Sequence, residues 1–218
     1  MIVSGLGLLF WILDFLGVFI GAFGGAVDAI RENRYKYDFI GVLGLAFTSA
    51  LGGGIVRDVV LQKGPPLAFL DIRYELIAFA GAFVALAFRS RIGTRADRMI
   101  VIIDAAVIGF FSVAGTTRAL HAGLMPLPSI LLGVVTAVGG GSLRDVLSGT
   151  VPRIFERGQF YAIAALAGAG TYFLLCRAGM PEAISSALAV AICFSLRILS
   201  WKFNWRTRPV RNSVPVGD

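Results

Sequence analysis

Histidine and cysteine are scarce in this chain. Among 218 residues there are one histidine, His121, and two cysteines, Cys176 and Cys193. A single histidine makes a catalytic relay hard to assemble, and the sequence has no HExxH, GxSxG, GxGxxG or Walker motif. The cysteines lie in apolar runs without metal-ligand spacing or a disulfide framework, which is typical of small buried side chains. We therefore expect no enzyme activity, no metal site and no cofactor.

Charged residues are also scarce. They make up 15% of the chain, whereas 57% of its residues are hydrophobic and the mean hydropathy is +0.81. An average soluble domain carries about 25% charged residues. The charges fall in clusters between apolar runs, which is typical of a polytopic membrane protein. The net charge of +7 lies beside the ends of these runs rather than on one face, so it indicates membrane topology and no nucleic-acid partner.

The apolar runs predict the fold class, an all-α polytopic membrane protein with seven transmembrane helices. A span needs about 20 apolar residues. The third candidate is weak, because only Leu76–Phe88 lies between Glu75 and Arg89. We expect one membrane domain over residues 1–218, ending in a basic tail at 204–218. The predicted helices lie at about residues 5–28, 38–61, 72–90, 99–118, 127–148, 158–176 and 181–203.

Lysine and arginine fix the expected orientation. With seven spans, 15 of these residues fall on one side of the membrane and 5 on the other, and dropping the weak third span would scramble this segregation. Because basic residues concentrate on the cytoplasmic side, the N-terminus is predicted outside and the C-terminus in the cytoplasm. The N-terminus lacks the basic region of a cleavable signal peptide, so the first span is expected to be retained.

One heptapeptide pattern occurs twice. GGGIVRD occupies residues 52–58 and GGGSLRD residues 139–145, an offset of 87. Upstream, LDFLGVFIGAFGGAVDAI from Leu13 resembles IDAAVIGFFSVAGTTRAL from Ile103, so that Asp14 matches Asp104. The two units, at about 5–90 and 99–176, hold three spans each. Since three is odd, the second unit enters the membrane upside down, giving two inverted three-helix repeats with the seventh helix outside them.

The glycine triplets fall slightly past the middle of the second and fifth spans. They are Gly52, Gly53 and Gly54 in one repeat and Gly139, Gly140 and Gly141 in the other. Each glycine weakens a helix by about 0.8–1 kcal/mol relative to alanine. We expect both helices to break here and to form a polar locus inside the bilayer, since freed backbone groups need protein or water as partners. The alternative is that the glycines only permit close helix packing.

The charged residues of the repeats need partners if they lie within the apolar thickness. Adjacent helical residues point about 100° apart. We therefore predict that Arg57 pairs with Asp145, and Arg144 with Asp58, across the two-fold axis. The alternative places these residues at the membrane interface, with side chains reaching towards water.

The other polar residues have two interpretations each. Asp14 and Asp104 lie near the starts of their spans, where they either cap the helix or face the polar locus and favour cations. Thr48, Ser49 and Thr136 precede the glycines, where they either line the pathway or bond to the preceding helical turn.

These features resemble the prokaryotic trimeric intracellular cation channels, a family also described as a duplicated glycine transporter domain. The resemblance covers about residues 10–200 and rests on the boxes TSALGGGIVRD and TAVGGGSLRD, on Asp14 and Asp104, and on Pro65, Pro66 and Pro152. It implies a homotrimer with one pore through each subunit for monovalent cations such as K⁺ and Na⁺. It further implies pores associated with the glycine-bearing second and fifth helices.

The chain departs from the family's animal members. These have a Lys-Glu-Val box on the fourth helix that contributes to phosphoinositide binding, and this sequence has none. Arg118, near the end of the fourth span, is a partial counterpart and a candidate for a lipid-related role. Phosphoinositide regulation is therefore not expected from the resemblance, although a bound lipid is compatible with it.

The sequence thus predicts a passive K⁺- or Na⁺-permeable channel in a prokaryotic inner membrane. The alternative is a secondary transporter for a small zwitterion such as glycine, because inverted repeats suit alternating access equally well. In that case the paired arginines and aspartates would bind its carboxylate and ammonium groups. The sequence does not separate the two.

Overall fold

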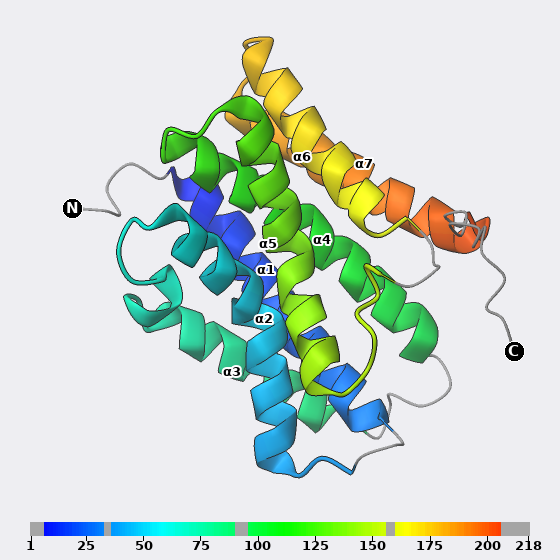
Figure 1. Ribbon diagram of the computed structural model, residues 1–218. Helices are drawn as coiled ribbons and strands as arrows, with labels where there is room; N and C mark the ends of the chain where they lie inside the picture. The colour runs from blue at the N-terminus through cyan, green and yellow to red at the C-terminus, as the bar shows by residue number, and fades with distance from the viewer. Residues whose placement is uncertain (1–6, 33–35, 90–95, 156–159, 206–218) are drawn as a thin grey trace, which may run out of the picture.

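The computed structural model describes residues 7–32, 36–89, 96–155 and 160–205, and in these residues all regular structure is helical. The first unit contains α1 (Leu8–Arg31), α2 (Phe39–Leu61), the short 3-10 helix η1 (Leu67–Phe69) and α3 (Arg73–Ala87). The second unit contains α4 (Ala96–His121), α5 (Pro126–Leu147) and α6 (Ala162–Arg177), and α7 (Glu182–Lys202) follows it (Figure 1).

These helices match the seven predicted spans closely. Residues 5 and 6 of the first predicted span, the predicted start of the sixth at Gly158 and residues 206–218 of the basic tail lie outside the described residues. Five helices, α1, α2, α4, α5 and α7, are long and apolar enough to cross a membrane. The chain is therefore an all-α membrane protein.

The two shorter helices occupy equivalent places in the two repeats. α3 has 15 residues and α6 has 16. A helix of 15 residues is roughly 22 Å long, less than the roughly 30 Å of a bilayer's hydrocarbon core. The weak third span thus exists as a short helix, which begins just after η1.

Local signals at the ends of α2 and α5 account for their bounds. The Asp38 carboxylate accepts a hydrogen bond from the Gly41 N–H at 2.7 Å and caps the start of α2. α5 starts with Pro126, whose missing N–H has no partner to lose in the first turn. Positive φ values follow both helices, at Gln62 (50°) and at Gly149 (67°), and stop the helical path.

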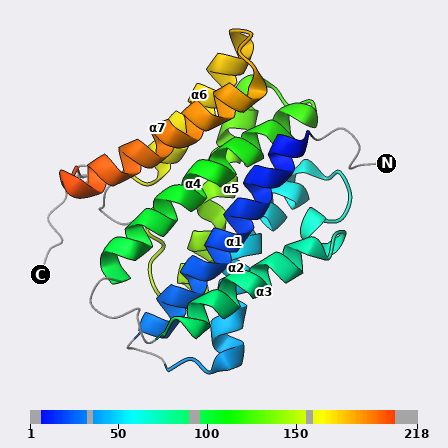
Figure 2. The ribbon, with the colours of Figure 1, turned by 180° about the vertical axis from the view of Figure 1, so that it is seen from behind.

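The helices pack as an inverted repeat. α1 packs against α2 and α3, and α4 packs against α5 and α6 in the same way. α1 and α4 lie side by side in the middle of the molecule, and α2 also contacts α5 (Figure 2). α7 covers α4 and α6. In this way the second repeat gains a covering helix that lies outside the two-fold arrangement.

Glycine lets the helices of each repeat approach closely. A Cβ built at Gly81 of α3 would lie 2.4 Å from the carbonyl oxygen of Phe19 in α1. Gly168 of α6 is the residue 87 positions later, and a Cβ there would lie 2.9 Å from the Oγ of Ser112 in α4. Close backbone contact of this kind drives helix association in lipid, where burial of apolar surface contributes little.

Candidate functional site

The glycine triplets lie where α2 crosses α5. A Cβ built at Gly53 would lie 2.1 Å from the carbonyl oxygen of Thr136, and one at Gly140 would lie 2.2 Å from that of Ser49. The two contacts are equivalent, because each pair of matching residues is 87 positions apart. The backbones of α2 and α5 therefore touch at their crossing, and no larger residue fits at Gly53 or Gly140.

The predicted break of these helices is wrong. Both α2 and α5 are continuous α-helices through Gly52–Gly54 and Gly139–Gly141. The alternative, close packing, is what the structure shows. Low helix propensity is a weak tendency that tertiary contact overrides, and here the contact is made by the very residues that weaken the helix.

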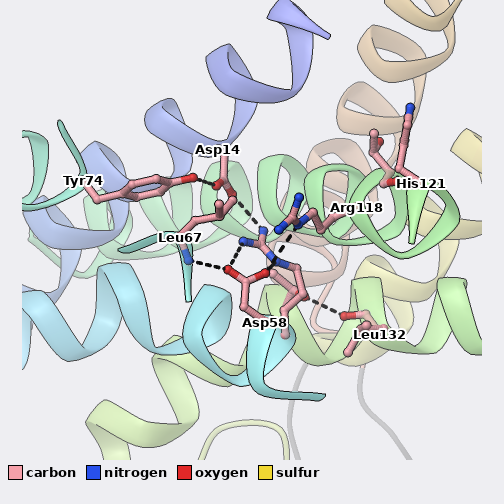
Figure 3. A network of polar contacts seen from close by, with 10 residues as sticks. Asp14, Asp58, Leu67, Tyr74, Arg118, His121 and Leu132 are labelled. Atoms are coloured by element: carbon pink, nitrogen blue, oxygen red, sulfur yellow. Dashed lines mark hydrogen bonds and ion pairs between the residues drawn. The ribbon is translucent and has the colours of Figure 1, made fainter. Parts of the chain in front are cut away.

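Two buried charge clusters flank the crossing. The first cluster consists of Asp14, Arg57, Asp58, Tyr74 and Arg118 (Figure 3). Arg57 is 1% exposed, and its Nε and Nη2 donate to the two carboxylate oxygens of Asp58 at 2.8 and 3.1 Å. Its Nη1 donates to Asp14 at 3.2 Å, and the Tyr74 hydroxyl donates to the other oxygen of Asp14.

The first cluster is sealed. The Asp58 carboxylate also accepts the N–H of Leu67 at 2.9 Å, and Arg118 reaches it from α4, with its Nε 3.6 Å from Oδ1 (Figure 3). The adjoining cavity, lined by Asp14, Gly54 and other residues, measures about 10 Å³. That volume holds about one water molecule.

The second cluster lies at the other end of α1. It consists of Asp28, Asp104, Arg144, Asp145 and Arg153. Arg144 contacts Asp28 through Nη1 at 2.6 Å and Asp145 through Nη2 at 2.7 Å. Arg153, in the segment after α5, contacts Asp104 through Nη1 at 2.5 Å and Asp28 through Nη2 at 3.1 Å.

The second cluster opens into a cavity of about 380 Å³. Asp28, Arg144, Asp145 and Arg153 line it together with polar residues such as Thr150. Although burial alone would lower the pKa of Arg153, the carboxylates of Asp104 and Asp28 hold it above its ordinary value. The guanidinium is therefore charged at any physiological pH. The two clusters thus differ in access, one sealed and one open.

The predicted pairing across the two-fold axis, Arg57 with Asp145 and Arg144 with Asp58, is wrong. Each arginine instead binds the aspartate beside it. The Cα–Cβ bonds of adjacent residues do diverge, but the long arginine side chain curves back so that its guanidinium meets the neighbouring carboxylate. Arg57 and Arg144 are 1% and 4% exposed, so their side chains do not reach into water as the interfacial alternative expected.

Ion pairs between the repeats do exist, through Asp28, which the sequence had not singled out, and through Arg118, for which it had suggested only a lipid-related role. They are Asp28 with Arg144, Asp28 with Arg153, and Arg118 with Asp58. The alignment from Leu13 and Ile103 sets Asp28 opposite Arg118, 90 positions later. An acid in one repeat aligned with a base in the other was the sequence signal that could have predicted these pairs. For Arg153 there was none, because the equivalent residue 87 positions earlier is Pro66.

Asp14 and Asp104 belong to the clusters and are not helix caps. α1 begins at Leu8 and α4 at Ala96, so neither aspartate lies in a first turn. Both are buried, and their partners are side chains from other parts of the chain, Arg57 and Arg153. The capping interpretation is therefore wrong, and the two aspartates face buried ion-pair clusters rather than the locus expected at broken helices.

The hydroxyl residues before the glycines serve the helices. Thr48 donates to the Gly44 carbonyl at 2.8 Å and Thr136 to the Leu132 carbonyl at 2.7 Å, one turn earlier in each helix. Ser49 packs against α1, where a Cβ built at Gly25 would lie 2.7 Å from its own Cβ. Arg118 lies in the first cluster, and its lipid-related role stays a prediction.

Comparison with known proteins relates this architecture to a protein family. A family described as glycine transporter matches residues 11–90 and again residues 101–177. The chain belongs to this family. The two matches coincide with the two repeats, so the duplication inferred from the boxes is a property of the family's domain.

Several membrane proteins and solved structures are similar over nearly the whole chain. A membrane protein of Deinococcus radiodurans is 37% identical over 91% of this chain and 90% of its own length. The inner membrane protein YadS of Escherichia coli is 28% identical over 89% and 93%. The crystal structure of the trimeric intracellular cation channel orthologue from Rhodobacter sphaeroides aligns with a TM-score of 0.83, at 31% identity, over 91% of this chain and 100% of that chain.

Proposed function

We propose that the protein is a passive channel for monovalent cations, K⁺ or Na⁺, with one pore in each subunit of a homotrimer. The observation that carries this proposal is the pair of charge clusters, placed by the inverted repeat on the two sides of the α2–α5 crossing. Support comes from the similarity to the Rhodobacter sphaeroides protein, which is described as a trimeric cation channel. We further propose that the protein described here lies in the inner membrane, with its N-terminus outside and its C-terminus in the cytoplasm.

The pathway that we propose begins in the cavity of about 380 Å³ and passes the second cluster. It continues along the crossing near Gly54 and Gly141 and leaves past the first cluster. Neither cluster repels a cation, since its arginines are neutralised. The first holds two aspartates and two arginines, and the second three aspartates and two arginines.

The described conformation is a closed one under this proposal. The backbones touch at Gly53 and Gly140, and the space beside Arg57 admits about one water molecule. Opening then requires α2 and α5 to move apart at the crossing, where glycine makes a change of helix curvature less costly. Carbonyl oxygens and carboxylates exposed by this movement would replace part of the ion's hydration shell.

A carrier for a small zwitterion is the second candidate. The family description, glycine transporter, and the presence of Arg144 and Asp145 in one cavity both favour it. A guanidinium and a carboxylate side by side match the two charged groups of glycine. In this candidate the open cavity is the substrate site of one access state.

Recording from the reconstituted full chain separates the candidates. For a channel we expect unitary currents in a planar bilayer, with a reversal potential close to the K⁺ equilibrium potential in a KCl gradient. A reversal potential near that of Cl⁻ would contradict cation selectivity. Saturable uptake of labelled glycine into liposomes, with no unitary current, would overturn the channel and support the carrier.

A further inference from the structure

We infer that Arg153 is a tethered counter-ion that limits cation entry at the open end of the pathway. This inference rests on the proposed channel function. It concerns the cavity beside the second cluster, where the guanidinium of Arg153 occupies the carboxylate oxygens that a permeant cation would use.

The position of Arg153 differs from that of the other cluster arginine. Its side chain is 34% exposed, whereas that of Arg144 is 4% exposed. The guanidinium of Arg153 faces the cavity on one side and contacts Asp104 and Asp28 on the other, at 2.5 and 3.1 Å. It thus stands between water and the buried carboxylate of Asp104, and it also contacts Asp28, which itself lines the cavity.

The inverted repeat shows that Arg153 lies outside the shared framework. In the first repeat the equivalent of Asp104 is Asp14, which is bound by Arg57 and Tyr74. In the second repeat Arg144 contacts Asp28 instead, and Arg153 is the partner of Asp104. Because Pro66 occupies the equivalent place in the first repeat, Arg153 has no counterpart there and is present at the open end of the pathway.

A fixed guanidinium at this place lowers the local concentration of cations. The second cluster has a formal charge of −1, from three aspartates and two arginines. Without the charge of Arg153 it becomes −2, and the oxygens that Arg153 contacts on Asp104 and Asp28 are freed. A unit charge changes the concentration of nearby ions severalfold when salt is low and little when salt is high.

The first test replaces the charge in a recorded channel. We expect Arg153→Gln to raise single-channel K⁺ conductance about two- to fivefold in about 10 mM KCl, where the Debye length is about 30 Å. In about 1 M KCl, where it is about 3 Å, the variant and the wild type should conduct alike. Arg153→Lys keeps the charge and should behave as wild type. An Arg153→Gln conductance at low salt equal to or below that of the wild type would overturn the inference.

Two further experiments separate the effect of Arg153 from an effect on folding and from a general effect of removing a positive charge. Arg73→Gln is the matched control, because Arg73 forms an exposed ion pair with Asp71 and its loss removes the same charge elsewhere. Arg153→Cys, with Cys176 and Cys193 replaced by serine, allows modification after the channel has folded. A positively charged methanethiosulfonate should lower the current and a negatively charged one should raise it. Equal effects of both reagents would contradict the inference.

An equilibrium measurement separates failure of this inference from failure of the channel proposal. If the wild type carries no current, the channel proposal fails, and K⁺ binding is measured instead by thermal shift in KCl against N-methylglucamine chloride. A larger K⁺-dependent rise in Tm for Arg153→Gln than for the wild type supports competition by Arg153. Equal rises overturn it.

Discussion

At the scale of single residues, the buried charges are neutralised locally and then joined across the repeats. Arg57 and Arg144 each bind the next residue in the chain, while Asp28 and Arg118 supply the contacts between repeats. Removing one member of a buried pair leaves an uncompensated charge, which is strongly destabilising. The pairing scheme is therefore measurable as energetic coupling.

Double-mutant cycles distinguish the observed pairs from the predicted ones. For Asp28→Asn with Arg144→Gln we expect a coupling on the order of 1–3 kcal/mol, because the side chains are in contact at 2.6 Å. For Arg57→Gln with Asp145→Asn we expect additivity within about 0.5 kcal/mol. The measurement is the free energy of unfolding in mixed micelles. Comparable coupling in both cycles would contradict the pairing described above.

The identity of the charged residues was accessible from the sequence, but their partners were not. Repetition singled out Arg57, Asp58, Arg144 and Asp145, and all four are buried in the clusters. The pairs of adjacent residues were excluded because side chains at neighbouring helical positions point about 100° apart. That angle describes the directions of the Cβ atoms and does not include the length of an arginine side chain. Arg153 lies in a loop without a repeat partner, so no periodicity pointed to it.

At the scale of helices, the tightest contacts at the crossing of α2 and α5 are made by two of the six repeated glycines. Gly53 and Gly140 touch carbonyl oxygens of the opposite helix. Gly54 has only the Arg57 guanidinium nearby, 3.6 Å from a Cβ built there. The glycines of one triplet therefore differ in their contacts with the opposite helix, so a substitution of one serves as a control for a substitution of another.

Alanine substitutions within one triplet test this inequality. Gly53→Ala should lower the free energy of unfolding by on the order of 1–3 kcal/mol, because its Cβ would overlap the Thr136 carbonyl and force the helices apart. Gly140→Ala should do the same through Ser49. Gly54→Ala should be neutral or stabilising, since alanine favours the helix by about 1 kcal/mol. Thermal unfolding of the purified variants gives the ranking, and a destabilised Gly54→Ala with an unaffected Gly53→Ala would refute it.

Helix positions were predictable because the apolar runs and the charges between them leave few alternatives. The second helix, expected at 38–61, lies at Phe39–Leu61, and the weak third one is shortened to Arg73–Ala87. The expected break at the glycines failed for a physical reason. Intrinsic propensity measures what an isolated helix prefers, whereas contact with a second helix decides what a glycine does in a membrane.

At the scale of the whole molecule, two similar halves form a structure whose ends differ. α7 packs on the second repeat, and within the described residues the second cluster opens into a cavity of about 380 Å³, whereas the cavity beside the first measures about 10 Å³. The segregation of basic residues, 15 to 5, predicts a direction for the molecule in the membrane.

Reporter fusions test that direction. Green fluorescent protein fused after residue 218 should fluoresce, because it folds in the cytoplasm, whereas alkaline phosphatase at the same place should be inactive. A phosphatase fused in the segment between α4 and α5 should be active. The reverse pattern at both sites would mean that the open cavity faces outward and not towards the cytoplasm.

Asp28 and Arg118 occupy equivalent places in the two repeats but carry opposite charges. This difference bears on rectification, which is an inequality between inward and outward current. A duplicated chain with identical ends would present the same field to ions arriving from either face, and its current would be equal in both directions. Here an acid of α1 reaches the arginine of one box, and a base of α4 reaches the aspartate of the other. One cluster is thus acidic and the other neutral, and for the channel proposed above we expect unequal inward and outward currents.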